Sequence, residues 1–127
     1  MHTINFGEPV FDMLEILRYK SGFVIPRIMF NDGVSVSIQC HWGAYCDPRP
    51  TTGENWSLSQ LPNNFEAGFP STLIDELMPY AEEQEHPTET VYPHVPCNVI
   101  EGIIKSHGGI VKLTSNECIF KRRNYSE

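Results

Sequence analysis

The stretch FVIPRIMFNDGVSVSIQC, residues 23–40, carries the strongest structural signal in this sequence. Two runs rich in β-branched and aromatic residues, 23–30 and 34–40, flank Asn31-Asp32-Gly33, and an Asp-Gly pair between such runs is typical of a β-hairpin turn. In the second run apolar and polar residues alternate, so the predicted strand has one buried face and one solvent-facing side. Pro26 cannot donate a ladder hydrogen bond, which predicts that the first strand lies at a sheet edge or is irregular there.

Two main helices are expected to back the sheet that this hairpin begins. The first is predicted from about Glu8 to Lys20, because Pro9 suits a first helical turn and apolar residues then recur at helical spacing. The second is predicted from about Cys97 to His107, with Gly108 at its C-terminal cap. Shorter elements are predicted as strands at 65–69, 88–95, 110–113 and 118–121 and as a helix at 71–78 that Pro79 stops. The expected fold class is therefore α+β, an antiparallel sheet backed by two main helices.

Length and composition predict one domain over residues 1–127. The chain is 40% hydrophobic and 20% charged, which is ordinary for a globular protein. A long irregular loop is expected at about 41–64 and an acidic connection at about 75–89. Because the first residues lack a basic region followed by an apolar run, and no apolar stretch is long enough to span a bilayer, we expect a cytoplasmic protein without membrane contact.

Charge favours a protein partner over a nucleic acid. The formal net charge is -7, whereas nucleic-acid binding needs basic side chains that displace counterions from phosphates. The most concentrated acids form either a solubilising face or a patch that meets a host protein with a basic surface. A homo-oligomer is also compatible with the sequence. The acids in this patch are Asp75, Glu76, Glu82, Glu83, Glu85 and Glu89.

The irregular loop carries an unusual amount of aromatic surface. Trp42, Tyr45 and Trp56 lie in it together with Arg49. These side chains either cover the core beneath the loop or form a recognition surface for a protein. The same rings and the guanidinium also suit a small nucleotide, which makes nucleotide sequestration an alternative function.

Cysteine and histidine residues raise two chemical hypotheses. A zinc-stabilised module would use ligands drawn from both halves of the chain, although no Cys-x-x-Cys pair is present and Cys40 lies on the apolar face of its strand. A nucleophilic thiol at Cys46 would need a neighbouring base, and the sequence contains no recognised enzyme or phosphate-binding motif around it. We therefore expect a non-enzymatic protein without catalytic residues, bound metal or cofactor. The candidate zinc ligands are Cys40, His41, Cys46, His94 and Cys97.

Several short words resemble a family of small uncharacterised proteins encoded by bacteriophages and prophages. They are VSVSIQ at 34–39, YCDPR at 45–49, GFPS at 68–71, TETVY at 88–92 with VP at 95–96, and the run from Ile103 to HGGI at 107–110. The resemblance spans about 33–111. It implies a phage-derived inhibitor that binds and blocks a host system, including defence systems such as CRISPR, and it supplies no catalytic residues.

Overall fold

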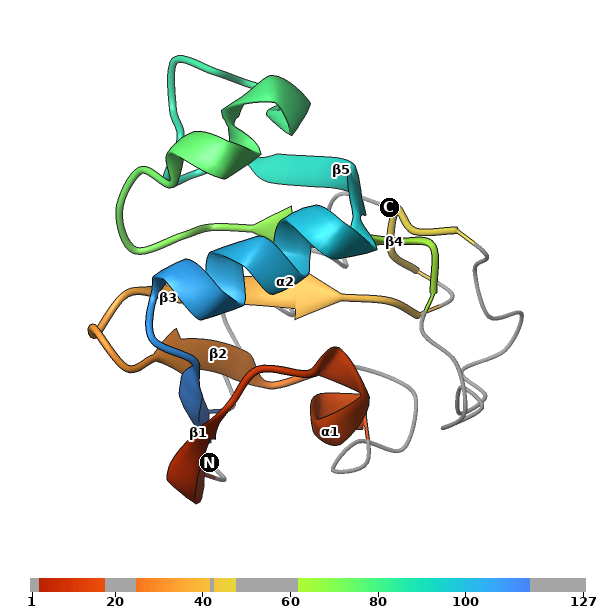
Figure 1. Ribbon diagram of the computed structural model, residues 1–127. Coiled ribbons are helices and arrows are strands. Elements are labelled where there is room, and N and C mark those ends of the chain that lie inside the picture. Colours follow the sequence, from red (N-terminus) through yellow and green to blue (C-terminus); the bar gives the residue numbers. More distant parts are fainter. Residues whose placement is uncertain (1–2, 18–24, 42, 48–61, 115–127) are drawn as a thin grey trace.

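The computed structural model describes residues 3–17, 25–41, 43–47 and 62–114 (Figure 1). These residues build a six-stranded sheet of order β1-β6-β2-β3-β4-β5, in which every neighbouring pair is antiparallel. One hydrophobic core lies against it. The predicted antiparallel sheet is thus confirmed. The elements are β1 (Thr3–Val10), α1 (Met13–Leu17), β2 (Arg27–Phe30), β3 (Ser35–Gln39), β4 (Asn64–Gly68), the 3-10 helix η1 (Asp75–Tyr80), β5 (Val91–Pro96), α2 (Cys97–Ser106) and β6 (Ile110–Thr114).

The predicted hairpin is present as β2 and β3. In its turn the Asp32 carboxylate accepts a hydrogen bond from the Val34 N–H at 3.0 Å, and Gly33 adopts φ +91°. A positive φ of this kind is accessible to glycine at little cost. Of the two alternatives predicted from Pro26, the edge position of the first strand is wrong, because β2 lies between β6 and β3. Pro26 comes just before the strand begins, so its missing N–H removes no ladder hydrogen bond.

The alternating pattern of β3 does not give it a solvent-facing side, and that prediction is wrong. All five residues of the strand are buried, including Ser35, Ser37 and Gln39. The Gln39 amide donates to the Ile25 carbonyl at 2.8 Å and to Ser37 Oγ at 2.9 Å, and its oxygen accepts from the Ile25 N–H at 2.9 Å. Polar side chains can be buried on this face because they bond to one another and to the backbone.

The C-terminal helix α2 confirms the sequence pattern and covers one face of the sheet (Figure 1). Ile100, Ile103 and Ile104 are buried. The helix ends as predicted, with Gly108 at φ +85° and its N–H donating to the Lys105 carbonyl at 3.1 Å.

The N-terminal helix is much shorter than predicted. Residues 3–10 form β1 instead, which pairs with β6 so that Ile4 lies opposite Leu113. Within residues 3–17 the only helix is α1, whose Met13 and Ile16 are fully buried. Residues 18–20 of the predicted helix lie outside the described residues. Pairing with the distant strand β6 takes the predicted start of the helix at residues 8–10, whereas Met13 and Leu17 of the helical pattern do lie in α1. The prediction that two main helices back the sheet is therefore not confirmed, and the described residues are mostly sheet.

The remaining elements shift in position or in partner. The predicted strands at 65–69 and 88–95 appear as β4 and β5. The strand at 110–113 appears as β6, but it pairs with β1 and β2, and its predicted partner at 118–121 lies outside the described residues. The predicted helix at 71–78 becomes η1, and Pro79 lies inside this element rather than stopping it.

Candidate functional site

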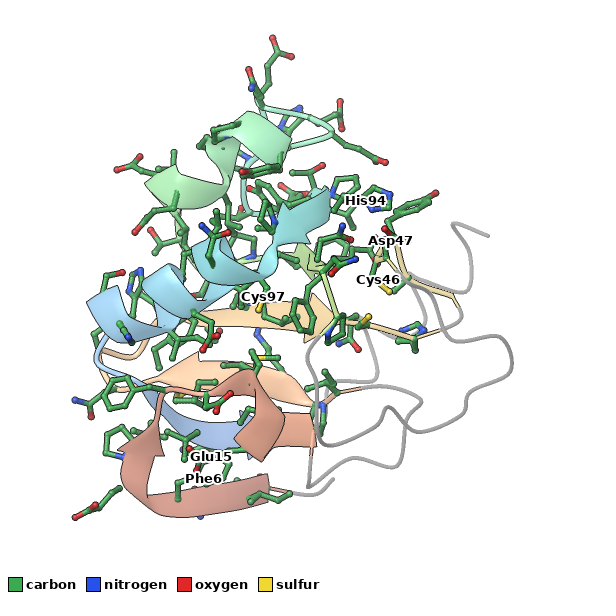
Figure 2. All side chains as sticks on the ribbon, turned by 45° about the vertical axis from the view of Figure 1, so that its right-hand side comes forward. Phe6, Glu15, Cys46, Asp47, His94 and Cys97 are labelled. Atoms are coloured by element: carbon green, nitrogen blue, oxygen red, sulfur yellow. The ribbon has the colours of Figure 1, made fainter. Side chains whose placement is uncertain are left out.

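Six exposed acids gather on one excursion of the chain. Residues 75–89 connect β4 to β5, and their six carboxylates are all exposed; these side chains are here called the acidic cap. In Figure 1 the excursion lies beyond β5 at one end of the molecule, and Figure 2 shows many side chains pointing outward from it. The acidic cap consists of Asp75, Glu76, Glu82, Glu83, Glu85 and Glu89.

Buried contacts hold the cap excursion firmly against the sheet. Ile74 and Leu77 are buried in the core on either side of the first two acids. Further along, the Glu82 N–H donates to the Val91 carbonyl at 3.0 Å, which ties the excursion to the edge strand β5. The hydroxyl of the fully buried Tyr92 donates to the Pro87 carbonyl. The carboxylates are therefore carried by a backbone that is bonded to the core.

The chain enters the cap through a turn that Arg27 holds. The Arg27 guanidinium donates to the Phe69 carbonyl at 2.6 Å and to Ser35 Oγ at 3.0 Å. Phe69 has φ +50°, a sparsely populated conformation for a residue other than glycine, and Ser71 bonds to Ser35 through both its N–H and its Oγ. Partial burial lowers the pKa of Arg27, yet an arginine stays charged at physiological pH. The Arg27 guanidinium thus stabilises the turn through which the chain enters the cap.

The negative charge of the cap has little compensation. Residues 62–104 contain no Lys or Arg. Within the described ranges, none of the six carboxylates forms an ion pair, and Glu76 accepts a hydrogen bond from Ser106 Oγ at 3.3 Å. Clustered like charges create a negative potential that attracts a basic surface.

The structure describes only one of the four predicted loop residues. Tyr45 has 44% of its surface exposed, and its ring lies 6.4 Å from the ring of His94 at an angle of 46°. Trp42, Arg49 and Trp56 lie outside the described residues. The aromatic recognition surface therefore stays a prediction, and Tyr45 is the one of its residues that the structure describes.

The proposed zinc ligands are not brought together. Among the described residues, which include all five candidates, no three His, Cys, Asp or Glu side chains are grouped so that they could hold a metal ion. Cys40 and Cys46 are buried, with their thiols directed to the carbonyls of Asn64 and His41 at 4.0 and 3.8 Å. The five candidate zinc ligands therefore do not converge in the described structure, and the two buried thiols pack as small hydrophobic groups.

Thiol chemistry has little support at the positions that the structure describes. Burial raises the pKa of the Cys97 thiol, and the neighbouring Glu101 raises it further. A raised pKa keeps the group as a thiol, whereas a nucleophile or zinc ligand needs the thiolate. Cys46, the candidate nucleophile, is 4% exposed.

His94 is the residue that sequence reasoning undervalued. The sequence suggested it only as a candidate zinc ligand, whereas the structure places it in a β-bulge with φ +52° and an exposed side chain. A β-bulge redirects side chains and is frequent beside functional sites. The signal that could have found the bulge is the preceding Pro93, because proline inside a strand is confined to edges, first residues and bulges.

No family model matches the chain, and neither a curated protein nor a solved structure matches it. In the part of the chain that the structure describes, no helix is long and apolar enough to cross a membrane. The function must therefore be inferred from the chain's own surface, where the acidic cap and the neighbouring Tyr45 and His94 are the outstanding features.

Proposed function

We propose that this chain is a non-enzymatic binding protein whose acidic cap docks onto a basic surface of a partner protein. The observation that carries the proposal is the gathering of six exposed carboxylates on one backbone excursion without an ion-pair partner among the described residues. A purely solubilising function needs charge but not this concentration on one side of the molecule. Complementary charge speeds association and selects partners.

The anchoring of the cap also favours binding. A carboxylate on a backbone bonded to the core keeps its position before the partner arrives, so less conformational entropy is lost on association. The bonds that supply this preorganisation come from Arg27 below the cap and from Tyr92 beside it.

A narrower hypothesis rests on the sequence resemblance alone. If the chain is of phage or prophage origin, its partner is a component of host machinery in the cytoplasm, and binding inhibits that component. An anti-defence protein, including an inhibitor of a CRISPR system, is the proposed form of this function. Such an inhibitor would occupy a basic groove that otherwise binds nucleic acid.

Affinity capture from a bacterial lysate with matched variants tests the proposal. One bait carries Glu83→Gln and Glu85→Gln in the cap, and the control bait carries Glu8→Gln and Glu15→Gln near the opposite edge of the sheet. Both variants remove two negative charges, so the net charge is the same. We expect a specific partner to be retained by the natural chain and the control and to be depleted with the cap variant. Equal recovery with both variants would assign the carboxylates to solubility.

Nucleotide sequestration remains the alternative function. It depends on Trp42, Arg49 and Trp56, which lie outside the described residues, together with Tyr45. A thermal-shift screen with linear and cyclic nucleotides tests it, because a ligand that binds only the folded chain raises its unfolding midpoint. No shift at about 1 mM nucleotide would end this alternative.

A further inference from the structure

A second feature lies where β5 leaves its regular pairing with β4. Phe65 pairs with Val95 and Ala67 with Tyr92, so β5 has one residue more than β4 between these pairs. His94 lies in this bulge with φ +52°, a conformation that few residues other than glycine adopt. The irregular backbone turns the histidine outward from the sheet edge, where its side chain is exposed.

Three segments of the chain meet at this bulge. The His94 N–H donates to the Tyr45 carbonyl at 3.1 Å, and His94 Nδ1 lies 3.1 Å from Asn64 Oδ1. Asp47 forms an antiparallel bridge with Asn64. Tyr45 and Asp47 are both exposed, whereas Cys46 between them is buried. Figure 2 shows His94, Asp47 and Cys46 close together at this corner.

The exposed groups of this corner are hydrogen-bond acceptors and aromatic faces. An amide oxygen can only accept, so the proton of a neutral His94 ring lies on Nδ1 and the lone pair lies on Nε2. Asp47 adds a carboxylate that has no ion-pair partner among the described residues. Tyr45 adds a ring whose centroid is 6.4 Å from that of His94. Such a set suits a ligand that is rich in donors and positively charged.

We propose that Tyr45, Asp47 and His94 form a receptor for one arginine side chain of the partner protein. A guanidinium offers five N–H donors and no acceptor, and its flat face stacks on aromatic rings. A lysine ammonium carries the same charge but lacks both the planar face and the forked donors. The inference rests on the proposed function, in which the acidic cap attracts the basic partner and this corner selects an arginine on it.

An NMR titration with two peptides tests the inference. Tetra-arginine and tetra-lysine carry equal charge, but carboxylates of the cap can also favour the forked donors of arginine, so the contribution of the corner is the part of the preference that changes at the corner remove. We expect the arginine peptide to bind at least fivefold more tightly and to shift the backbone amides of residues 45, 47, 64 and 94. Equal affinity for the two peptides, or no binding of either, overturns the inference.

Two substitutions in the corner test whether its side chains cause the preference for the arginine peptide. His94→Gly removes the ring while keeping a residue that accepts φ +52°, so the fold should survive. Asp47→Asn removes the charge of an exposed side chain. Both changes should reduce the arginine preference to less than twofold, and His86→Asn, a histidine change within the exposed turn of the cap excursion, should leave it intact. A preference that survives both His94→Gly and Asp47→Asn overturns the inference.

The same titration separates this inference from the proposed function. In the double variant Glu83→Gln with Glu85→Gln, both peptides should bind more weakly while their ratio is kept. If both peptides lose affinity in this variant but the natural chain never distinguishes them, the corner is not an arginine receptor and the cap remains a docking surface. If the ratio is kept and the cap change affects neither peptide, the arginine receptor stands and the proposed function fails.

Discussion

Replacing Tyr92 by Phe removes the hydroxyl group whose hydrogen bond ties the cap excursion to the sheet. The ring of Tyr92 is fully buried and should keep its packing in the variant, whereas the hydroxyl no longer donates to the Pro87 carbonyl. A neutral hydrogen bond contributes about 0.5–1.5 kcal/mol net, and a carbonyl left without a donor adds to the cost. We expect the free energy of unfolding to fall by about 1–2 kcal/mol.

Urea denaturation followed by tryptophan fluorescence measures this change. With a denaturant slope of about 2 kcal/mol/M, the midpoint should fall by about 0.5–1 M while the slope itself stays the same. Hydrogen exchange should also quicken at the amides of residues 82 and 83, which bond to Val91 and Thr90, the residues just before Tyr92. An unchanged midpoint together with unchanged exchange would refute the anchoring of the cap by Tyr92.

The same hydroxyl predicts how stability depends on alkaline pH. Burial raises the pKa of Tyr92 above its ordinary value. The unfolded tyrosine therefore ionises first, so the stability that this group contributes is fully present below about pH 10 and is lost as pH rises further. We expect the stability difference between the natural chain and Tyr92→Phe to be constant from pH 7 to about pH 9 and to narrow above about pH 10. A difference that widens at high pH would contradict this assignment.

Three further changes test the fold. Arg27→Met should lower the free energy of unfolding by about 1.5–3 kcal/mol in urea titrations, because the charged hydrogen bond to the Phe69 carbonyl is lost. Gly109→Ala should destabilise by more than about 2 kcal/mol in thermal unfolding, since φ is +90° and the new Cβ would lie 2.5 Å from Pro9 Cβ. Gly102→Ala, exposed in α2 with open space around it, should instead raise stability by about 0.5–1 kcal/mol, and a loss at this position would contradict the helix.

The sequence predicted those parts of the fold that local chemistry decides. Asp32 and Gly33 determine the hairpin turn through an acceptor and a positive φ, and both signals are visible in the residue types. The spacing of the buried isoleucines likewise predicts α2, and Gly108 predicts where this helix ends. These elements depend on neighbours within a few positions, so a single sequence is sufficient to recognise them.

The sequence could not reveal what distant pairing decides. The N-terminal helix was predicted to begin at about Glu8, yet residues 8–10 belong to a strand because β6, about a hundred residues further along the chain, pairs with them. The polar residues of β3 appeared to face solvent, and instead the structure buries them with bonds such as that of Gln39 to Ile25. Tertiary partners decided both outcomes.

In the candidate site, too, the features that depend on local residue types could be predicted, and those that depend on distant pairing were harder to predict. That the cap acids are exposed followed from the polar sequence around them, and the structure places all six at the surface. The corner at His94 depends on a one-residue difference between β4 and β5. Its mark in the sequence is Pro93, which indicates an edge or a bulge but does not reveal which segments meet there. The candidate zinc ligands do not converge in the described structure for a related reason, because closeness in sequence does not place side chains around one point.

The salt dependence of affinity for a captured partner tests the central claim most directly. Titration calorimetry would compare the natural chain with the variant Glu83→Gln and Glu85→Gln at about 0.05 M and about 0.3 M salt, where screening lengths differ more than twofold. Exposed charge pairs contribute about 0.2–1 kcal/mol each, so the natural chain should bind about tenfold more tightly than the variant at low salt, and this advantage should shrink at high salt. Equal affinities for both chains at both salt concentrations would show that the acidic cap does not bind the partner.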